Sequence, residues 1–202
     1  MKLPSSPAQC EEGGTEVMLP HALTDRFLRR ISTVHDAGLK SFGLLVGDPG
    51  DPSFPYRPVD VVFFDPRRNR RNEPAIQAAF HAQGSYFRTY DDAGFVADPA
   101  EVLAVDRDLD ARGLEAVALF HTHRRQPANF SHIDFRLHNP AYPWHLIISM
   151  RDARRPVLRA FGVRKMLDDF GIGSGDANEG SECDYTGPEV TPLAIVSDTR
   201  AA

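Results

Sequence analysis

The segment Glu115–His123 reads Glu-Ala-Val-Ala-Leu-Phe-His-Thr-His, and it decides the fold. Its apolar run predicts a buried strand over 115–120 that leads directly into His121. Side chains two apart on a strand point to the same side, so His121 and His123 are expected to lie together where the strand ends. Two imidazoles in that arrangement can share a cation.

A second polar group follows His123 after seven intervening residues. Ser131-His-Ile-Asp134 predicts a short helix over 131–138, with Ser131 as its N-cap. Asp134 would lie in the first turn and face back toward the strand end. Two histidines and one carboxylate, with a fourth position left for water, are typical of catalytic zinc, whereas magnesium and calcium prefer more oxygen ligands. The alternative interpretation is a surface loop that happens to carry histidines.

The flanking sequence alternates between helical and extended patterns. Asp98, Pro99 and Glu101 form an N-terminal capping pattern for a helix that ends at Gly113. We expect further helices over 19–36 and 75–82, and strands over 42–47, 59–64, 86–90, 144–150 and 156–163. The expected fold class is therefore α/β, with a mixed β-sheet flanked by helices and no internal repeat.

Charge divides the 202-residue chain into three parts. The chain carries a net charge of −5, of which residues 1–16 contribute −2 and residues 171–202 contribute −5, so residues 17–170 have a net charge of +2. The last part is also rich in glycine, serine and aspartate, a composition that buries too little apolar surface to fold. We expect a flexible N-terminal segment over 1–16, one domain over 17–170 and a flexible acidic tail over 171–202.

Several classes of protein are excluded by these patterns. A nearly neutral domain argues against nucleic-acid binding. No apolar run is long enough to span a membrane, and the first residues lack the apolar core of a secretion signal, so a cytoplasmic location is expected. Cys10 and Cys183 are too few for a disulfide scaffold. The basic run 67–71 has two readings: a solvated loop or a contact for an acidic partner.

The pattern His121-x-His123, seven residues, then Ser131-x-x-Asp134 resembles the signature of the JAMM/MPN+ zinc metalloproteases. The segment 43–47, Gly-Leu-Leu-Val-Gly, is similar to the first strand of that family. The resemblance implies a mixed sheet of the cytidine-deaminase-like kind. It also implies Zn²⁺ held by His121, His123 and Asp134, with Ser131 donating a hydrogen bond to the oxyanion.

This resemblance also implies a function. Its members hydrolyse peptide, isopeptide or related amide bonds, including those at the Gly-Gly tail of ubiquitin-like and sulfur-carrier proteins. A protein of that kind, or an adduct of one, is therefore the expected partner. The sequence does not indicate the oligomeric state.

One position departs from the family pattern. The family's general base is a glutamate three residues before the first glycine of 43–47, where this chain has Lys40. An ammonium group cannot accept a proton from water, and loss of a general base costs about 10²- to 10⁴-fold in rate. Three explanations stay open. The chain could be a zinc-binding interaction domain with impaired catalysis, or Asp36 or Glu73 could be a substitute base. In the third explanation, the substrate supplies the base or Lys40 has an altered role.

Three other histidines lie near the pattern. His132 and His138 flank Asp134, and both are expected at the surface, with support of the metal ligands as the alternative. His145 is expected to begin a core strand beside Trp144.

Overall fold

The computed structural model describes residues 16–82, 85–89, 93–166 and 184–198. Most of the predicted flexible segments, with Cys10 and Cys183, lie outside the described residues. The strands are β1 (Glu16–Pro20), β2 (Phe42–Gly47), β3 (Pro58–Phe63), β4 (Glu115–His123), β5 (Trp144–Ser149), β6 (Val157–Val163) and β7 (Val190–Asp198). The helices are α1 (His21–Asp36), α2 (Pro74–Ala82), α3 (Ser85–Thr89), α4 (Pro99–Arg112) and α5 (His132–Leu137), with short 3₁₀ turns at Pro66–Arg68 and Arg70–Asn72.

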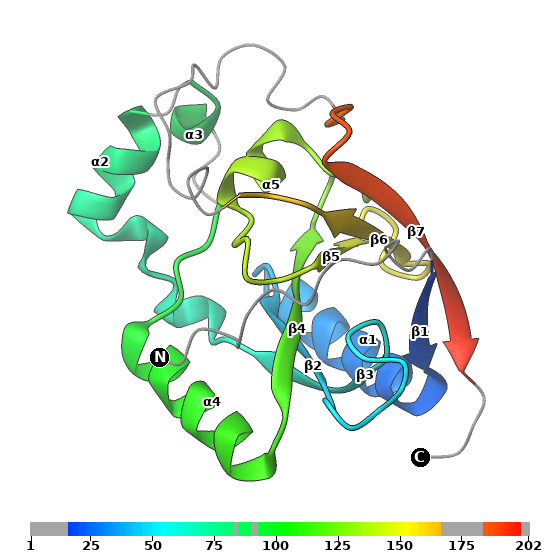
Figure 1. Ribbon diagram of the computed structural model, residues 1–202. Helices are drawn as coiled ribbons and strands as arrows, with labels where there is room; N and C mark the ends of the chain where they lie inside the picture. The colour runs from blue at the N-terminus through cyan, green and yellow to red at the C-terminus, as the bar shows by residue number, and fades with distance from the viewer. Residues whose placement is uncertain (1–15, 83–84, 90–92, 167–183, 199–202) are drawn as a thin grey trace.

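The described strands form one mixed sheet in the order β1-β7-β6-β5-β4-β2-β3. Strand β4 pairs parallel with β5 and antiparallel with β2, so it lies inside the sheet. Figure 1 shows α2 and α3 together at one side of the molecule, while β1 and β7 form its opposite side. The predicted α/β class with a mixed, helix-flanked sheet is confirmed.

Alternating side chains place two apolar layers on opposite faces of the sheet. Helix α1 packs on one face, where Phe27 meets Phe120 edge-to-face at a centroid distance of 4.9 Å. Helix α4 contributes Val102 and Val105 to a cluster on the other face. His121 follows Phe120 directly and therefore points to the α4 face. Strand alternation thus puts the histidine pair on the face opposite α1.

Gly43 lies where β2 passes close to its neighbours, and it is expected to be intolerant of a side chain. A Cβ added there would meet the Val62 carbonyl oxygen at 2.0 Å and the Phe120 ring at 2.8 Å. We expect Gly43→Ala to lower the free energy of unfolding by about 1–3 kcal/mol, the usual cost of overpacking. Chemical denaturation measures this change. Gly162→Ala in β6 is the matched control, because its Cβ would meet nothing closer than 3.5 Å; an equal loss in both variants would contradict the explanation.

One helix boundary and one element type differ clearly from the sequence prediction. The helix predicted over 19–36 begins at His21, because Glu16–Pro20 forms β1. The strand predicted over 86–90 is wrong, since Ser85–Thr89 is helix α3. The aromatic and β-branched residues there favour a strand locally, but Phe87 packs on Phe80 and its carbonyl accepts a hydrogen bond from Arg71 at 2.9 Å. Tertiary contacts therefore override the local preference.

The prediction that 171–202 is a flexible tail is wrong for residues 190–198. Residues Val190–Asp198 form β7, which pairs antiparallel with β6 and parallel with β1. Leu193 is buried in the core cluster under α1. Arg57 donates to Asp198 at 2.8 Å and to Asp51 at 2.7 Å, which fixes the end of the strand. A short alternating apolar pattern inside an acidic segment was enough to complete the sheet.

Within the described residues, none of the helices combines the length and apolar character that crossing a bilayer requires.

Candidate metal centre

The centre of the site is the end of β4. His121 and His123 point to the same side of that strand, and the Nε2 atoms of the two rings lie 2.9 Å apart. The Nδ1 atom of His123 lies 2.7 Å from the Pro127 carbonyl oxygen. A carbonyl oxygen only accepts, so His123 Nδ1 carries the proton and Nε2 presents a lone pair in the neutral ring. The loop after β4 therefore fixes which His123 nitrogen is available as a ligand.

Asp134 reaches the same point from the first turn of α5. Ser131 and Asp134 form a capping box in which the Ser131 side chain accepts from the Asp134 N–H. In return, Asp134 Oδ2 accepts from the Ser131 N–H at 2.8 Å and from the Ser131 hydroxyl at 2.6 Å. The other carboxylate oxygen, Oδ1, lies 3.1 Å from His121 Nε2. The capping box therefore directs one oxygen toward the histidines.

Two separations between these atoms are close to those around a tetrahedral metal. The ligand atoms of His121, His123 and Asp134 all lie within 4.8 Å of one another. Zinc–ligand bonds of about 2.0–2.1 Å place tetrahedral ligands roughly 3.3 Å apart, close to the 2.9 and 3.1 Å separations at His121 Nε2. Nitrogen donors with a single carboxylate favour zinc over magnesium or calcium.

Burial and charge give this cluster the ionisation that a cation needs. Burial and the neighbouring His121 lower the pKa of His123 to about 4, against the attraction of Asp134. Burial disfavours ionisation of Asp134, but the nearby His121 and His123 and the Ser131 hydrogen bond outweigh it and hold its pKa well below the usual range. At neutral pH the site therefore offers an ionised carboxylate and an uncharged His123 ring, which is the form that binds metal.

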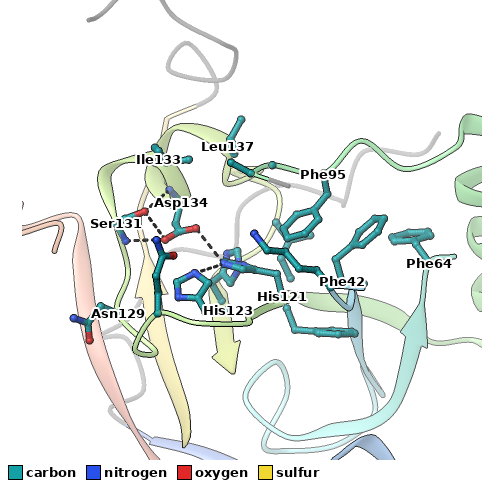
Figure 2. A pocket seen from close by; sticks show the side chains of 18 of the residues that line it. Phe42, Phe64, Phe95, His121, His123, Asn129, Ser131, Ile133, Asp134 and Leu137 are labelled. Atoms are coloured by element: carbon teal, nitrogen blue, oxygen red, sulfur yellow. Dashed lines mark hydrogen bonds and ion pairs between the residues drawn. The ribbon is translucent and has the colours of Figure 1, made fainter. Parts of the chain in front are cut away.

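The cluster forms part of the wall of a cavity of ≈ 350 Å³. Figure 2 shows Phe42, Phe64 and Phe95 on one side of His121 and the Ser131–Asp134 turn on the other. Phe95 stacks on Phe42 at a centroid distance of 4.7 Å and lies 5.3 Å from the His121 ring. The volume is in the range of small-molecule sites, and the cavity combines an apolar wall with a few convergent polar groups, as such sites do.

The sequence also matches a known family, Prok-JAB, the prokaryotic homologs of the JAB domain, over residues 41–161. The chain belongs to this family. The resemblance seen in the sequence is thereby confirmed at the level of the JAB domain. No curated protein matches the sequence.

Two solved structures share this fold. Protein DSY2949 from Desulfitobacterium hafniense is 20% identical, covers 91% of this chain and 94% of its own, and superposes with a TM-score of 0.58. A protein from Salinibacter ruber is 18% identical, covers 90% of this chain and 92% of its own, with a TM-score of 0.52. A JAB1/MPN domain protein from Archaeoglobus fulgidus, AF2198, is 12% identical over 91% of this chain and all of its own, with a TM-score of 0.40.

The remaining candidate residues of the JAB domain separate into two groups. Lys40 lies just before β2 and lines the same cavity as His121, His123, Ser131 and Asp134. Asp36 is the exposed last residue of α1 and is not among the cavity-lining residues. Glu73 is exposed and paired with Arg70 at 2.6 Å, also away from the cavity lining. Asp134 is the one carboxylate among the described residues that line this cavity.

The basic run 67–71 has a structural role in the JAB domain. Arg71 is 1% exposed, and its guanidinium donates to the carbonyls of Ala93 at 2.8 Å and Phe87 at 2.9 Å. Ala93 lines the cavity, so Arg71 holds one of its walls. Arg68 and Arg70 pair with acidic side chains of the same chain. Three of the four arginines thus make intramolecular contacts.

Two further histidines lie near the site, and for His138 the expected surface position is wrong. His138 is fully buried rather than at the surface, and His145 in β5 also lines the cavity. Burial lowers the pKa of His138 to about 4 and that of His145 well below its usual value. The signal was present in the sequence, because His145 has the strand parity that points away from the α1 face. The contact between His145 and His121 could be recognised only once the register of β4 and β5 is known.

Proposed function

We propose that this JAB domain is a zinc-dependent hydrolase of a peptide, isopeptide or related amide bond. The observation that carries the proposal is the convergence of His121 Nε2, His123 Nε2 and Asp134 Oδ1 at the wall of a cavity. Three protein ligands leave one coordination position for water, as in catalytic rather than structural zinc sites. A divalent ion bound there would lower the pKa of coordinated water to about 7 and polarise a substrate carbonyl.

Ser131 is proposed to stabilise the negative charge that develops on the carbonyl oxygen. Its hydroxyl donates to Asp134 Oδ2 in this structure, and its backbone N–H donates to the same oxygen. If the hydroxyl turns toward a substrate, the backbone N–H still holds the carboxylate. Ser131 can therefore act on the substrate without releasing the ligand that it positions.

Lys40 is proposed to contribute its positive charge rather than to accept a proton. It lines the cavity with the three ligands, and its charge acts on His123, whose pKa is lowered mainly by burial. A fixed cation beside a developing oxyanion stabilises the transition state. This assignment extends the third explanation for Lys40 and makes no use of Asp36 or Glu73, which lie away from the cavity lining.

A second candidate is a metal-binding interaction domain without catalysis. The observation in its favour is that Asp134, itself a proposed ligand, is the one carboxylate among the described cavity-lining residues. A site with no separate general base is expected to hydrolyse amides slowly. Both candidates predict metal binding, so activity has to separate them.

The test combines metal analysis with a cleavage assay. We expect the purified protein to contain one zinc ion per chain by elemental mass spectrometry. The substrate for the assay is a ubiquitin-like sulfur-carrier protein extended by a short peptide after its Gly-Gly terminus, and intact-mass analysis detects release of the extension. Zinc-dependent release supports the hydrolase. Stoichiometric zinc without release from this or other amide substrates supports the interaction domain, and absence of zinc binding contradicts both.

A further inference from the structure

Four histidine rings lie in a continuous row of close nitrogen–nitrogen contacts through the site. His123 Nε2 lies 2.9 Å from His121 Nε2, and His121 Nδ1 lies 2.8 Å from His145 Nε2. His145 Nδ1 lies 3.1 Å from His138 Nδ1, and His138 Nε2 lies 2.8 Å from the Tyr142 carbonyl oxygen. The row therefore connects the proposed ligand His121, through His145 and His138, with the Tyr142 carbonyl.

The Tyr142 carbonyl sets the direction of the hydrogen bonds that link His138, His145 and His121. A carbonyl oxygen only accepts, so His138 Nε2 carries a proton and donates it. In the neutral ring, His138 Nδ1 then has a lone pair and accepts from His145 Nδ1–H. His145 Nε2 in turn has a lone pair and accepts from His121 Nδ1–H. One backbone acceptor thus fixes the tautomers of two rings and the position of one proton on a third.

The consequence falls on His121. With the proton held on Nδ1, the opposite nitrogen, Nε2, is the atom left for a ligand, and it faces His123 and Asp134. The Pro127 carbonyl does the same for His123 from the other side. Both Nε2 atoms are therefore directed to the same point by backbone carbonyls.

Packing isolates this row from water, which would otherwise supply alternative partners. His138 is 0% exposed and His145 is 5% exposed. The Phe130 ring lies edge-on to both, with centroid distances of 6.5 Å to His138 and 5.5 Å to His145. Lys165 donates to the carbonyls of Phe135, Arg136 and His138, which fixes the end of α5 that carries His138. Since buried polar groups require partners, the rings have little freedom to reverse their hydrogen bonds.

We propose that His138 and His145 are positioning residues that hold His121 in its metal-binding tautomer. The proposal rests on the metal site of the proposed function, but it does not depend on which reaction that site performs. Partners of this kind, which hold the second nitrogen of a ligating imidazole, typically contribute 10- to 100-fold to metal affinity.

The first test needs no variant. Long-range ¹H–¹⁵N spectra of the metal-free protein distinguish protonated from unprotonated imidazole nitrogens. We expect His121 and His145 to be protonated on Nδ1 and His138 on Nε2. A His121 ring with unprotonated Nδ1, or a His145 ring protonated on Nε2, would overturn the proposal. This measurement stands whether or not any activity is found.

The second test removes the acceptor two rings away from the metal. His138→Leu would leave His145 Nδ1–H unpaired, and moving that proton to Nε2 would set a donor against His121 Nδ1. We expect zinc affinity, measured by competition with a chromogenic chelator, to fall about 10- to 100-fold. His138→Asn, whose amide oxygen can accept from His145, should recover most of that loss. His21→Gln, at an exposed site at the start of α1, is the control for replacing a histidine.

The outcomes separate this proposal from the proposed function. A folded His138→Leu protein with wild-type zinc affinity and unchanged His121 spectra would refute the positioning role of His138 while leaving the metal site intact. Failure of the wild-type protein to bind zinc would refute the proposed function instead. If His138→Leu does not fold, the spectra of the wild-type protein still decide whether the tautomers are as assigned.

Discussion

Replacing His123 by alanine is expected to abolish stable zinc binding and, with it, all zinc-dependent hydrolysis. His123 supplies one of three ligand atoms that lie within 4.8 Å of one another. Loss of partners behind a ligand already costs about 10- to 100-fold in affinity, so loss of a ligand itself should cost more than about 100-fold. Chelator competition and elemental analysis measure the loss, and the cleavage assay should return to background.

His132→Ala is the matched control for this variant. His132 is the exposed residue that opens α5, and it is outside the ligand group although it lies two residues from Asp134. It should retain one zinc per chain. His123 belongs to none of the four described apolar clusters, so His123→Ala should keep the wild-type circular dichroism. A folded His123→Ala protein that binds zinc as tightly as the wild type would contradict the assigned site.

Replacing Lys40 by methionine is expected to lower kcat/KM about 10²- to 10³-fold without changing zinc content. This magnitude is typical for removal of a single group that stabilises an oxyanion. Lys40→Arg keeps the positive charge and should lose less activity than Lys40→Met. Steady-state kinetics on the carrier-protein substrate provide the comparison, with metal content determined on the same samples.

Lys40→Glu distinguishes the two candidate functions. If Lys40 acts through its charge, a carboxylate at that position should reduce the activity of the wild-type enzyme. If the wild-type protein binds zinc but has no activity, and Lys40→Glu creates activity, the protein is an interaction domain that has lost its general base. Activity that is equal in Lys40→Met and wild type would refute the charge-based role.

The sequence predicted that His121, His123 and Asp134 lie together because the determinants of this group are local. Strand alternation fixes the relation of His121 to His123, and a capping box fixes Asp134 relative to Ser131. Each pair spans four residues or fewer, so their relative geometry requires no knowledge of the sheet. The joining of the two pairs required only a loop of seven residues.

The rest of the site could not be read in the same way. His145 and His138 join the row through the parallel register of β4 and β5 and the end of α5, which are contacts between distant segments. Arg71 was expected to belong to a solvated basic run, but it donates to the carbonyl of the cavity-lining residue Ala93 and to that of Phe87. Charge patterns describe averages over a segment, whereas one buried arginine depends on a tertiary contact.

Two strands at one end of the sheet, β1 and β7, lie outside the part of the chain that matches the family. Strands β1 and β7 pair with each other, and Figure 1 shows these dark blue and red arrows side by side at the edge of the sheet. Both lie outside residues 41–161. Just before β7, Tyr185 N–H donates to the Phe130 carbonyl at 2.7 Å, and Asp184 forms a bridge with Ser131. Residues 41–161, which match the family, therefore do not include every residue that contacts the segment around Ser131. A fragment limited to 41–161 would lack the contacts of Asp184 and Tyr185 with that segment.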